Sequence, residues 1–197
     1  MSLHITSTTK SVHIRPKTKD ELKRLVDAEI ERQGPDVDLN FIDVSDITSM
    51  YMLFCDTDIR NIKIDEWNVS NVTDMAGMFM DCPELSADLS GWDTSNVTDM
   101  RSTFNGCCNF DCDLSKWDIY NVKNISFMFN CCGQFNCDLS NWDVSNVRHM
   151  NSVFYECSKF NCDLSNWDVS NVSYRHTNMF KGCSIKESHK PKFQPVF

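Results

Sequence analysis

Apolar residues recur along this chain at a fixed interval of 25 residues. Five tryptophans mark the interval most clearly: Trp67, Trp92, Trp117, Trp142 and Trp167. Aligned on them, the chain follows the pattern L-x-x-W-x-V-x-N-V-x-x-M-x-x-x-F-x-x-C-x-x-F, and FNCDLSNWDVSNV occurs unchanged at 135–147 and 160–172. Repetition at such a period is typical of a structural unit that stacks on copies of itself.

Within one unit the pattern predicts a short strand followed by a short helix. The alternation in W-x-V suits a strand with one face inward. Thr73 or Thr98 could then accept a bond from a backbone N–H and start a helical turn. Met75, Met78 and Phe79 follow at the spacing of an inward helical stripe. We therefore predict an α/β fold, a leucine-rich-repeat-like solenoid of about six 25-residue coils, each with a short parallel strand and a short helix.

The outer coils are predicted to be irregular. The first, at 42–54, has Ile42 where the others have Trp, and the last has one residue inserted within SYRHTNMF at 173–180. Stacking would align the tryptophans as a buried spine. It would also let a row of asparagines satisfy the polar backbone of the turns. This row consists of Asn71, Asn96, Asn121, Asn146 and Asn171.

Both ends carry segments outside the repeat. Residues 16–35 predict a helix with a Thr18–Glu21 capping box and a Gly34-Pro35 stop. This helix either plugs the open end of the solenoid or docks a partner, and SVHIR at 11–15 could precede it as a strand. The predicted organisation is a strand-and-helix cap at 1–38, the solenoid at 39–184 and a tail at 185–197.

The tail either folds back over the last coil or binds a partner. Its candidate contact residues are Lys190, Lys192, Phe193 and Phe197.

Charge is distributed unevenly. The chain carries a net charge of −9, residues 1–35 carry +2 and residues 181–197 carry +3, which leaves −14 for residues 36–180. Such a body repels phosphate backbones, so nucleic acid is not the expected partner. One row of acids alternates with inward Trp and Val and should point outward from the strands: Asp93, Asp118, Asp143 and Asp168. A second row precedes the leucines: Asp88, Asp113, Asp138 and Asp163.

The acidic rows have three interpretations: a solvated face, a contact for a basic protein, or a calcium site. Because stacked like charges repel, backbone N–H groups, neighbouring serines or cations should compensate them.

Eleven cysteines are an odd number, so they cannot all pair within one chain. One set takes a core position and should pack as buried thiols: Cys82, Cys107, Cys132, Cys157 and Cys183. A second row consists of Cys112, Cys137 and Cys162. These residues are interpreted as reduced packed thiols, with a disulfide or a thiolate metal site as alternatives. The sequence contains no C-x-x-C pair, which would give the usual zinc spacing.

Other classes of protein find little support. No apolar run approaches the ~20 residues that span a bilayer, so no membrane insertion is expected. The N-terminus lacks the apolar core of a secretory signal, which favours an intracellular or virion location over secretion. No nucleophile elbow, phosphate loop or H-E-x-x-H helix is found, so neither an enzyme nor a cofactor is expected.

The unit WDVSNVTDMxxMF…C…FNxDLS resembles the BspA-type leucine-rich repeat proteins, also described as the DUF285 family. The segment PKTKDELKRLV…DLNFIDVSDITSM is similar to the N-terminal segment of many members, and the resemblance covers about residues 16–183. It implies a solenoid used for protein interaction, without catalytic residues. Members are known as bacterial surface proteins and adhesins, and as expanded sets in some protists and large DNA viruses. This chain departs from the secreted members in lacking an export signal and in having cysteines where others often carry Gln.

Three hypotheses for function follow. The first is a non-catalytic interaction module that presents its acidic face, with Asp93, Asp118, Asp143 and Asp168, to a basic protein. The second is a structural or assembly component of a virion or cell envelope. Self-association of the chain is compatible with this role. The third is a thiol-based metal or redox protein that uses the second row of cysteines.

Overall fold

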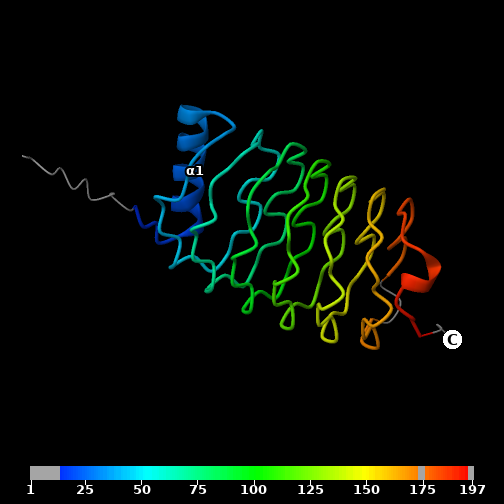
Figure 1. The fold of residues 1–197 in the computed structure, drawn as a ribbon. Coiled ribbons are helices and arrows are strands. Elements are labelled where there is room, and N and C mark those ends of the chain that lie inside the picture. The colour runs from blue at the N-terminus through cyan, green and yellow to red at the C-terminus, as the bar shows by residue number, and fades with distance from the viewer. Residues whose placement is uncertain (1–13, 173–175, 195–197) are drawn as a thin grey trace, which may run out of the picture.

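The fold is a stack of similar loops with a helix at one end (Figure 1). The computed structural model describes residues 14–172 and 176–194. Its helices are α1, at Lys19–Gln33, and the short 3-10 helix η1, at Glu187–His189. Between them the chain passes repeatedly across the stack, and each pass lies beside the next (Figure 1). Below, a coil is the stretch that begins at one Trp, or at Ile42 in the first coil, and ends before the next Trp. Neither helix in the described part combines the length and apolar character needed to cross a membrane.

α1 begins and ends where its capping residues dictate. The Thr18 hydroxyl accepts a bond from the Glu21 N–H at 3.2 Å, and the Glu21 carboxylate accepts one from the Lys17 N–H at 2.7 Å. Gly34 has a φ of 82° and donates its N–H to the Ile30 carbonyl, which ends the helix. One face of α1 is buried against the N-terminal end of the stack, through Leu22 and Val26.

The predicted α/β solenoid, with a parallel strand and a short helix in each coil, is wrong. In the described residues the sheet-like pairing is limited to isolated parallel bridges, and no helix lies between α1 and η1. The bridges join Ile14 to Ile42, Asp38 to Lys63, Ser49 to Asp74, Asn61 to Ser86, Asp74 to Asp99, Asp99 to Asn124, and Asn124 to His149. Residues 11–13 of the expected strand SVHIR lie outside the described residues.

The segments predicted as helices are series of tight turns. Leu53 donates its N–H to the Met50 carbonyl within its own coil, three residues back. Its neighbours Met52 and Phe54 instead donate to Ala76 and Met78 of the next coil, at 3.0 and 2.8 Å. Because every second N–H leaves the segment, the i→i−4 bonds of an α-helix cannot form. The apolar spacing of Met and Phe is the same in these turns as on a helix.

Left-handed backbone recurs at two positions in these turns. One set, the Met52 series, comprises Met52, Gly77, Ser102, Phe127, Ser152 and Asn178. The other, the Asp56 series, comprises Asp56, Asp81, Gly106, Cys131, Glu156 and Gly182. Each has a φ between 50° and 78°, and a residue other than glycine costs about 1–2 kcal/mol there. The bonds to the next coil offset this cost.

The threonines predicted to start helices link coils instead. The Thr73 hydroxyl donates to the Thr48 carbonyl at 3.1 Å, and the Thr98 hydroxyl donates to the Thr73 carbonyl at 3.0 Å. Their backbone N–H groups donate to the same carbonyls at 2.8 Å. The predicted capping role of Thr73 and Thr98 is therefore wrong, and each adds a second bond to the preceding coil.

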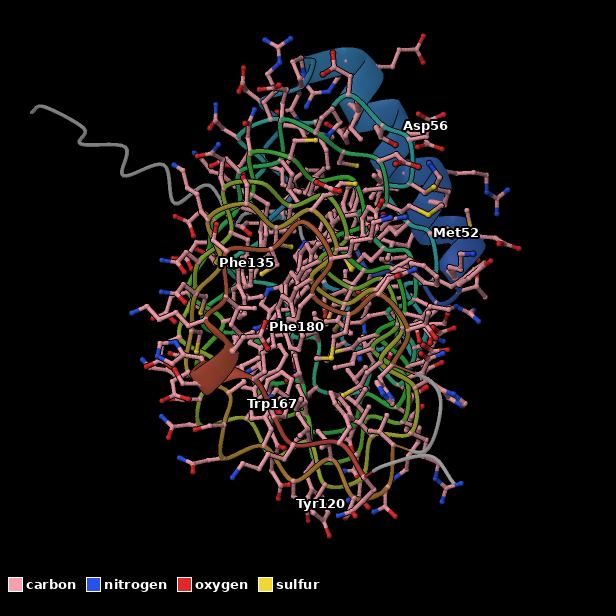
Figure 2. All side chains as sticks on the ribbon, turned by 90° about the vertical axis from the view of Figure 1, so that its right-hand side faces the viewer. Met52, Asp56, Tyr120, Phe135, Trp167 and Phe180 are labelled. Carbon is pink, nitrogen blue, oxygen red and sulfur yellow. The ribbon has the colours of Figure 1, made fainter. Side chains whose placement is uncertain are left out.

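Aromatic rings fill the centre of the stack, where Figure 2 shows Trp167 and Phe180 in a view along the stack from its C-terminal end. The five tryptophans are only 3–5% exposed. The ring centroids lie 6.4–6.5 Å apart in the neighbouring pairs Trp67–Trp92, Trp92–Trp117 and Trp142–Trp167. Each indole N–H donates to the backbone carbonyl 28 residues earlier; that of Trp117, for example, bonds Leu89 at 2.9 Å. Beside them runs a stack of phenylalanines with rings 5.3–5.8 Å apart: Phe54, Phe79, Phe104, Phe129, Phe154 and Phe180.

The described part of the tail folds over the C-terminal end of the stack. Ile185 is buried, and the Leu164 N–H donates to the carbonyl of His189 in η1 at 2.8 Å. Phe193 packs on the core, and its ring stacks on His176 at 4.0 Å. The residue inserted in the last coil falls in a segment, 173–180, of which 173–175 lie outside the described residues.

Replacing Trp117 by Ala should lower the free energy of unfolding by about 3–5 kcal/mol, since it opens a cavity and removes a bond to Leu89. Urea denaturation measures the change, with the exposed neighbour substitution Lys116→Ala as the control. If both variants unfold at the parental midpoint, the tryptophans do not contribute to the stability of the stack in this way.

Candidate functional site

The first candidate surface is a row of exposed acids, Asp93, Asp118, Asp143 and Asp168, here called the tip row. The prediction that they lie on strands is wrong, because each opens a turn. Each Oδ1 accepts the backbone N–H two residues later, at 2.9–3.1 Å. Tyr120, the donor to Asp118, lies at the lower edge of the stack in Figure 2 and marks this row.

At two residues of the tip row, Asp93 and Asp168, the turn favours the charged form of the carboxylate. Hydrogen bonds from the side chain and backbone of Ser95 lower the pKa of Asp93, and Ser170 acts in the same way on the pKa of Asp168. The asparagine after each turn donates its side-chain N–H to a carbonyl of the preceding coil; Asn121, for example, bonds Ser95 at 2.7 Å. The donors that compensate the stacked acids are therefore those of the turns themselves.

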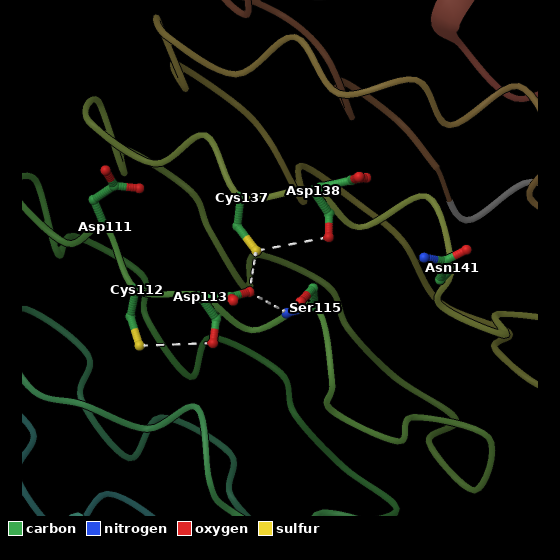
Figure 3. Close-up of a pocket in the computed structure, with 7 residues that line it drawn as sticks. All are labelled: Asp111, Cys112, Asp113, Ser115, Cys137, Asp138 and Asn141. Carbon is green, nitrogen blue, oxygen red and sulfur yellow. Dashed lines mark hydrogen bonds between the residues drawn. The ribbon is translucent and has the colours of Figure 1, made fainter.

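The second candidate surface combines acids and thiols (Figure 3). A hollow of about 500 Å³ includes Cys112, Asp113, Cys137 and Asp138 in its lining, and a second of about 350 Å³ shares Cys137 and Asp138. The Cys137 sulfur accepts the Leu114 N–H at 3.2 Å and lies 3.7 Å from the Asp113 carboxylate.

The same arrangement is repeated one coil later. Cys162 accepts the Leu139 N–H at 3.2 Å and lies 3.3 Å from Asp138. Cys112 accepts the Leu89 N–H at 3.4 Å. Each sulfur thus satisfies a backbone donor of the preceding coil.

This geometry does not favour thiol chemistry. Burial raises the pKa of Cys137 and of Cys162 to about 11, whereas the thiolate is the form that attacks substrates or binds metals. All eleven cysteines are free thiols. In the described part of the chain, no three His, Cys, Asp or Glu side chains are grouped so as to hold a metal ion.

The core cysteines have a related structural role. The Cys82, Cys107, Cys132 and Cys157 thiols donate to phenylalanine carbonyls of the preceding coil at 2.8–3.0 Å. Burial raises the pKa of Cys82 to about 11 and the pKa of the other three further. Cys183 is half-buried and lies 3.4 Å from the Phe160 carbonyl.

The candidate contacts of the tail are partly occupied within the chain. Lys190 pairs with Glu187, and its ammonium lies over the Phe180 ring, 5.7 Å from the centroid. Phe193 is half-buried, Lys192 is exposed, and Phe197 lies outside the described residues.

Three exposed aromatic residues of the described part of the chain, Tyr51, Tyr120 and Phe127, are absent from the sequence-based candidates. Tyr120 is 51% exposed and Phe127 is 40% exposed. Tyr120 stands where the other coils have serine, and Phe127 stands in the Met52 series where its neighbours are Ser102 and Ser152. A large apolar residue at a surface position of a repeat is the signal that could have identified them.

In the native protein, a thiol reagent should modify the exposed Cys108 quickly but reach the four buried core thiols only after denaturation. Mass spectrometry of the native and denatured protein distinguishes the two groups, and the denatured sample is the control for full reactivity. Equal modification of all eleven thiols in the native state would contradict the packing described, and three or more native disulfides would indicate an oxidising compartment.

Comparison with known proteins supplies the family. No curated protein and no solved structure matches the chain. A family model described as "Mycoplasma protein of unknown function, DUF285" matches residues 23–119 and 82–193. These two overlapping matches include most of the repeats, α1 from Lys23 onward and the described tail up to Phe193. The chain therefore belongs to the DUF285 family.

Proposed function

We propose that this protein is a non-catalytic interaction module whose tip row binds a basic segment of a protein partner. The observation that carries the proposal is the placement of four exposed carboxylates at the same position of successive coils. Each turn requires only one carboxylate oxygen. The second oxygen can therefore accept a bond from a lysine or arginine of the partner.

The charge of the chain supports the same partner. Adjacent coils are held by backbone hydrogen bonds, so the carboxylates of the tip row repeat about every 5 Å. Residues 36–180 carry a net −14, and a field of one sign along a row attracts a basic partner and speeds its association. Added salt should slow that association, because exposed charges are screened within about 10 Å at 0.1 M.

Replacing Asp118, Asp143 and Asp168 together by Asn should weaken binding of a lysine- and arginine-rich peptide and remove much of its salt dependence. The fold should persist, since Asn keeps the Oδ1 acceptor and Asn68 already forms such a turn with Ser70 at 3.2 Å. Binding is measured by titration calorimetry at low and high salt, and the captured native partner is then tested in the same way.

The control removes the same charge from the other acidic row, by replacing Asp88, Asp113 and Asp163 with Asn. Equal weakening by both triple variants would mean that only net charge matters. Unchanged binding by the tip variant at low salt would show that the row is solvated surface, and the tail would become the preferred contact.

We further propose that the repeat is of the BspA type and that its unit is the 25-residue interval between tryptophans. The supporting observations are the recurring motif and the parallel bridges, most of which join residues 25 apart. A unit defined in this way should be removable as a whole, because its bonds go to its two neighbours.

Deleting residues 117–141 joins Lys116 to Trp142 and preserves the L-x-x-W spacing, so the shortened chain should fold cooperatively. The slope of its unfolding free energy against urea concentration should be smaller than that of the parent, because less surface is exposed on unfolding. Deleting residues 117–136 is the matched control and should abolish cooperative unfolding. If the two deletions behave alike, the interval is not the structural unit.

A further inference from the structure

Phe127 combines two features that the fold does not require. Its φ is 60°, a conformation in which a bulky side chain is strained, and its side chain is 40% exposed. Its backbone makes the same bond to the next coil as the earlier members of the series, with the N–H donated to the Asn151 carbonyl at 2.8 Å. The adjacent members of the Met52 series are Ser102 and Ser152, which make the same turns with small side chains. Phe127 therefore projects as an apolar knob from a row of smaller residues.

The same series also contains a hollow. A depression of about 80 Å³ is lined by Tyr51, Met52, Gly77, Met80 and Ser102, among others. It exists because Gly77 has no side chain: a Cβ there would lie 3.1 Å from the Met52 Cγ and 3.9 Å from the Met80 Cβ. Tyr51, at its rim, is 40% exposed and has the Lys19 ammonium of α1 5.0 Å from its ring centroid. The hollow is thus bordered by apolar and aromatic groups together with the polar side chains of Ser102 and Arg101.

The knob and the hollow lie on one side of the stack. Phe127 and Gly77 hold the same position in coils that are two steps apart, so they are separated by about 10 Å along the stack. Ser102 lies midway between them. Figure 2 shows this side through Met52, well away from Tyr120 and the tip row.

We propose that this side of the stack binds a second copy of the chain, with Phe127 of each copy inserted beside Gly77 of the other. A two-fold axis in the plane of the contact, passing near Ser102 and perpendicular to the stack, exchanges the Phe127 position of one copy with the Gly77 position of the other. Such an interface is self-complementary, since one patch supplies both the knob and the hollow. A second copy is the occupant because the feature that fits the hollow is present on the chain itself.

The test is sedimentation equilibrium of the full chain over a concentration series up to about 1 mM. The wild-type chain should form dimers as its concentration rises. Phe127→Ser removes the knob, and Gly77→Ser fills the hollow. Both introduce the residue found at Ser102 and Ser152, so both variants should fold, as circular dichroism and thermal unfolding would verify. Each variant alone should remain monomeric where the wild type is half dimeric.

An equimolar mixture of the two variants is the sharpest control. Phe127 of the Gly77→Ser chain can still enter the hollow of the Phe127→Ser chain, so the mixture should form a heterodimer that is weaker than the wild-type dimer. A wild-type chain that stays monomeric throughout would overturn the proposal. So would a Phe127→Ser variant that dimerises like the wild type, or a mixture that associates no more than its components.

Discussion

Hydrogen bonding between neighbouring coils is the constraint on which the rest of this structure depends. In each turn segment the backbone N–H groups alternate between a carbonyl of their own turn and a carbonyl of the next coil, as Leu53 and Phe54 show. That alternation requires left-handed residues at fixed places, and it excludes both a helix and a continuous strand. The aromatic stacks, the indole bonds and the thiol bonds all follow the same repeat.

Part of this fold can be predicted from the pattern of residues. The limits of α1 follow from Thr18 and Gly34, and the burial of one aromatic residue per coil follows from its regular spacing. The internal path of a coil could not be predicted, because spacings of three and four residues suit a helix and a series of turns equally well. Glycine at Gly77 and Gly106 hints at left-handed backbone, but elsewhere the Met52 series has Met, Ser, Phe or Asn and the Asp56 series has Asp, Cys or Glu. Bonds to a neighbouring coil, which no local pattern encodes, decide the conformation there.

The candidate surfaces show the same division. That Asp118 and its counterparts face solvent could be inferred from their alternation with inward residues, but the element that holds them could not. An Asp followed two residues later by a serine N–H is typical of a local turn, and this signal competes with the strand pattern. The bonds from leucine N–H groups to Cys112, Cys137 and Cys162 could not be foreseen, because they connect coils through sulfur. These bonds give the second row of cysteines a structural role, which is sufficient to explain why it recurs.

The seal at the C-terminal end has a consequence for how the chain is made. In earlier coils the corresponding leucine N–H donates to a cysteine sulfur, as that of Leu139 does to Cys162. The Leu164 N–H instead donates to the His189 carbonyl of the tail. α1 leaves the ribosome before the coils and offers its buried face to the first of them, and each later coil can then dock on one that is already formed. Synthesis and folding can therefore proceed in the same direction. The open edge of the growing stack passes from coil to coil until the segment that contains η1 covers it.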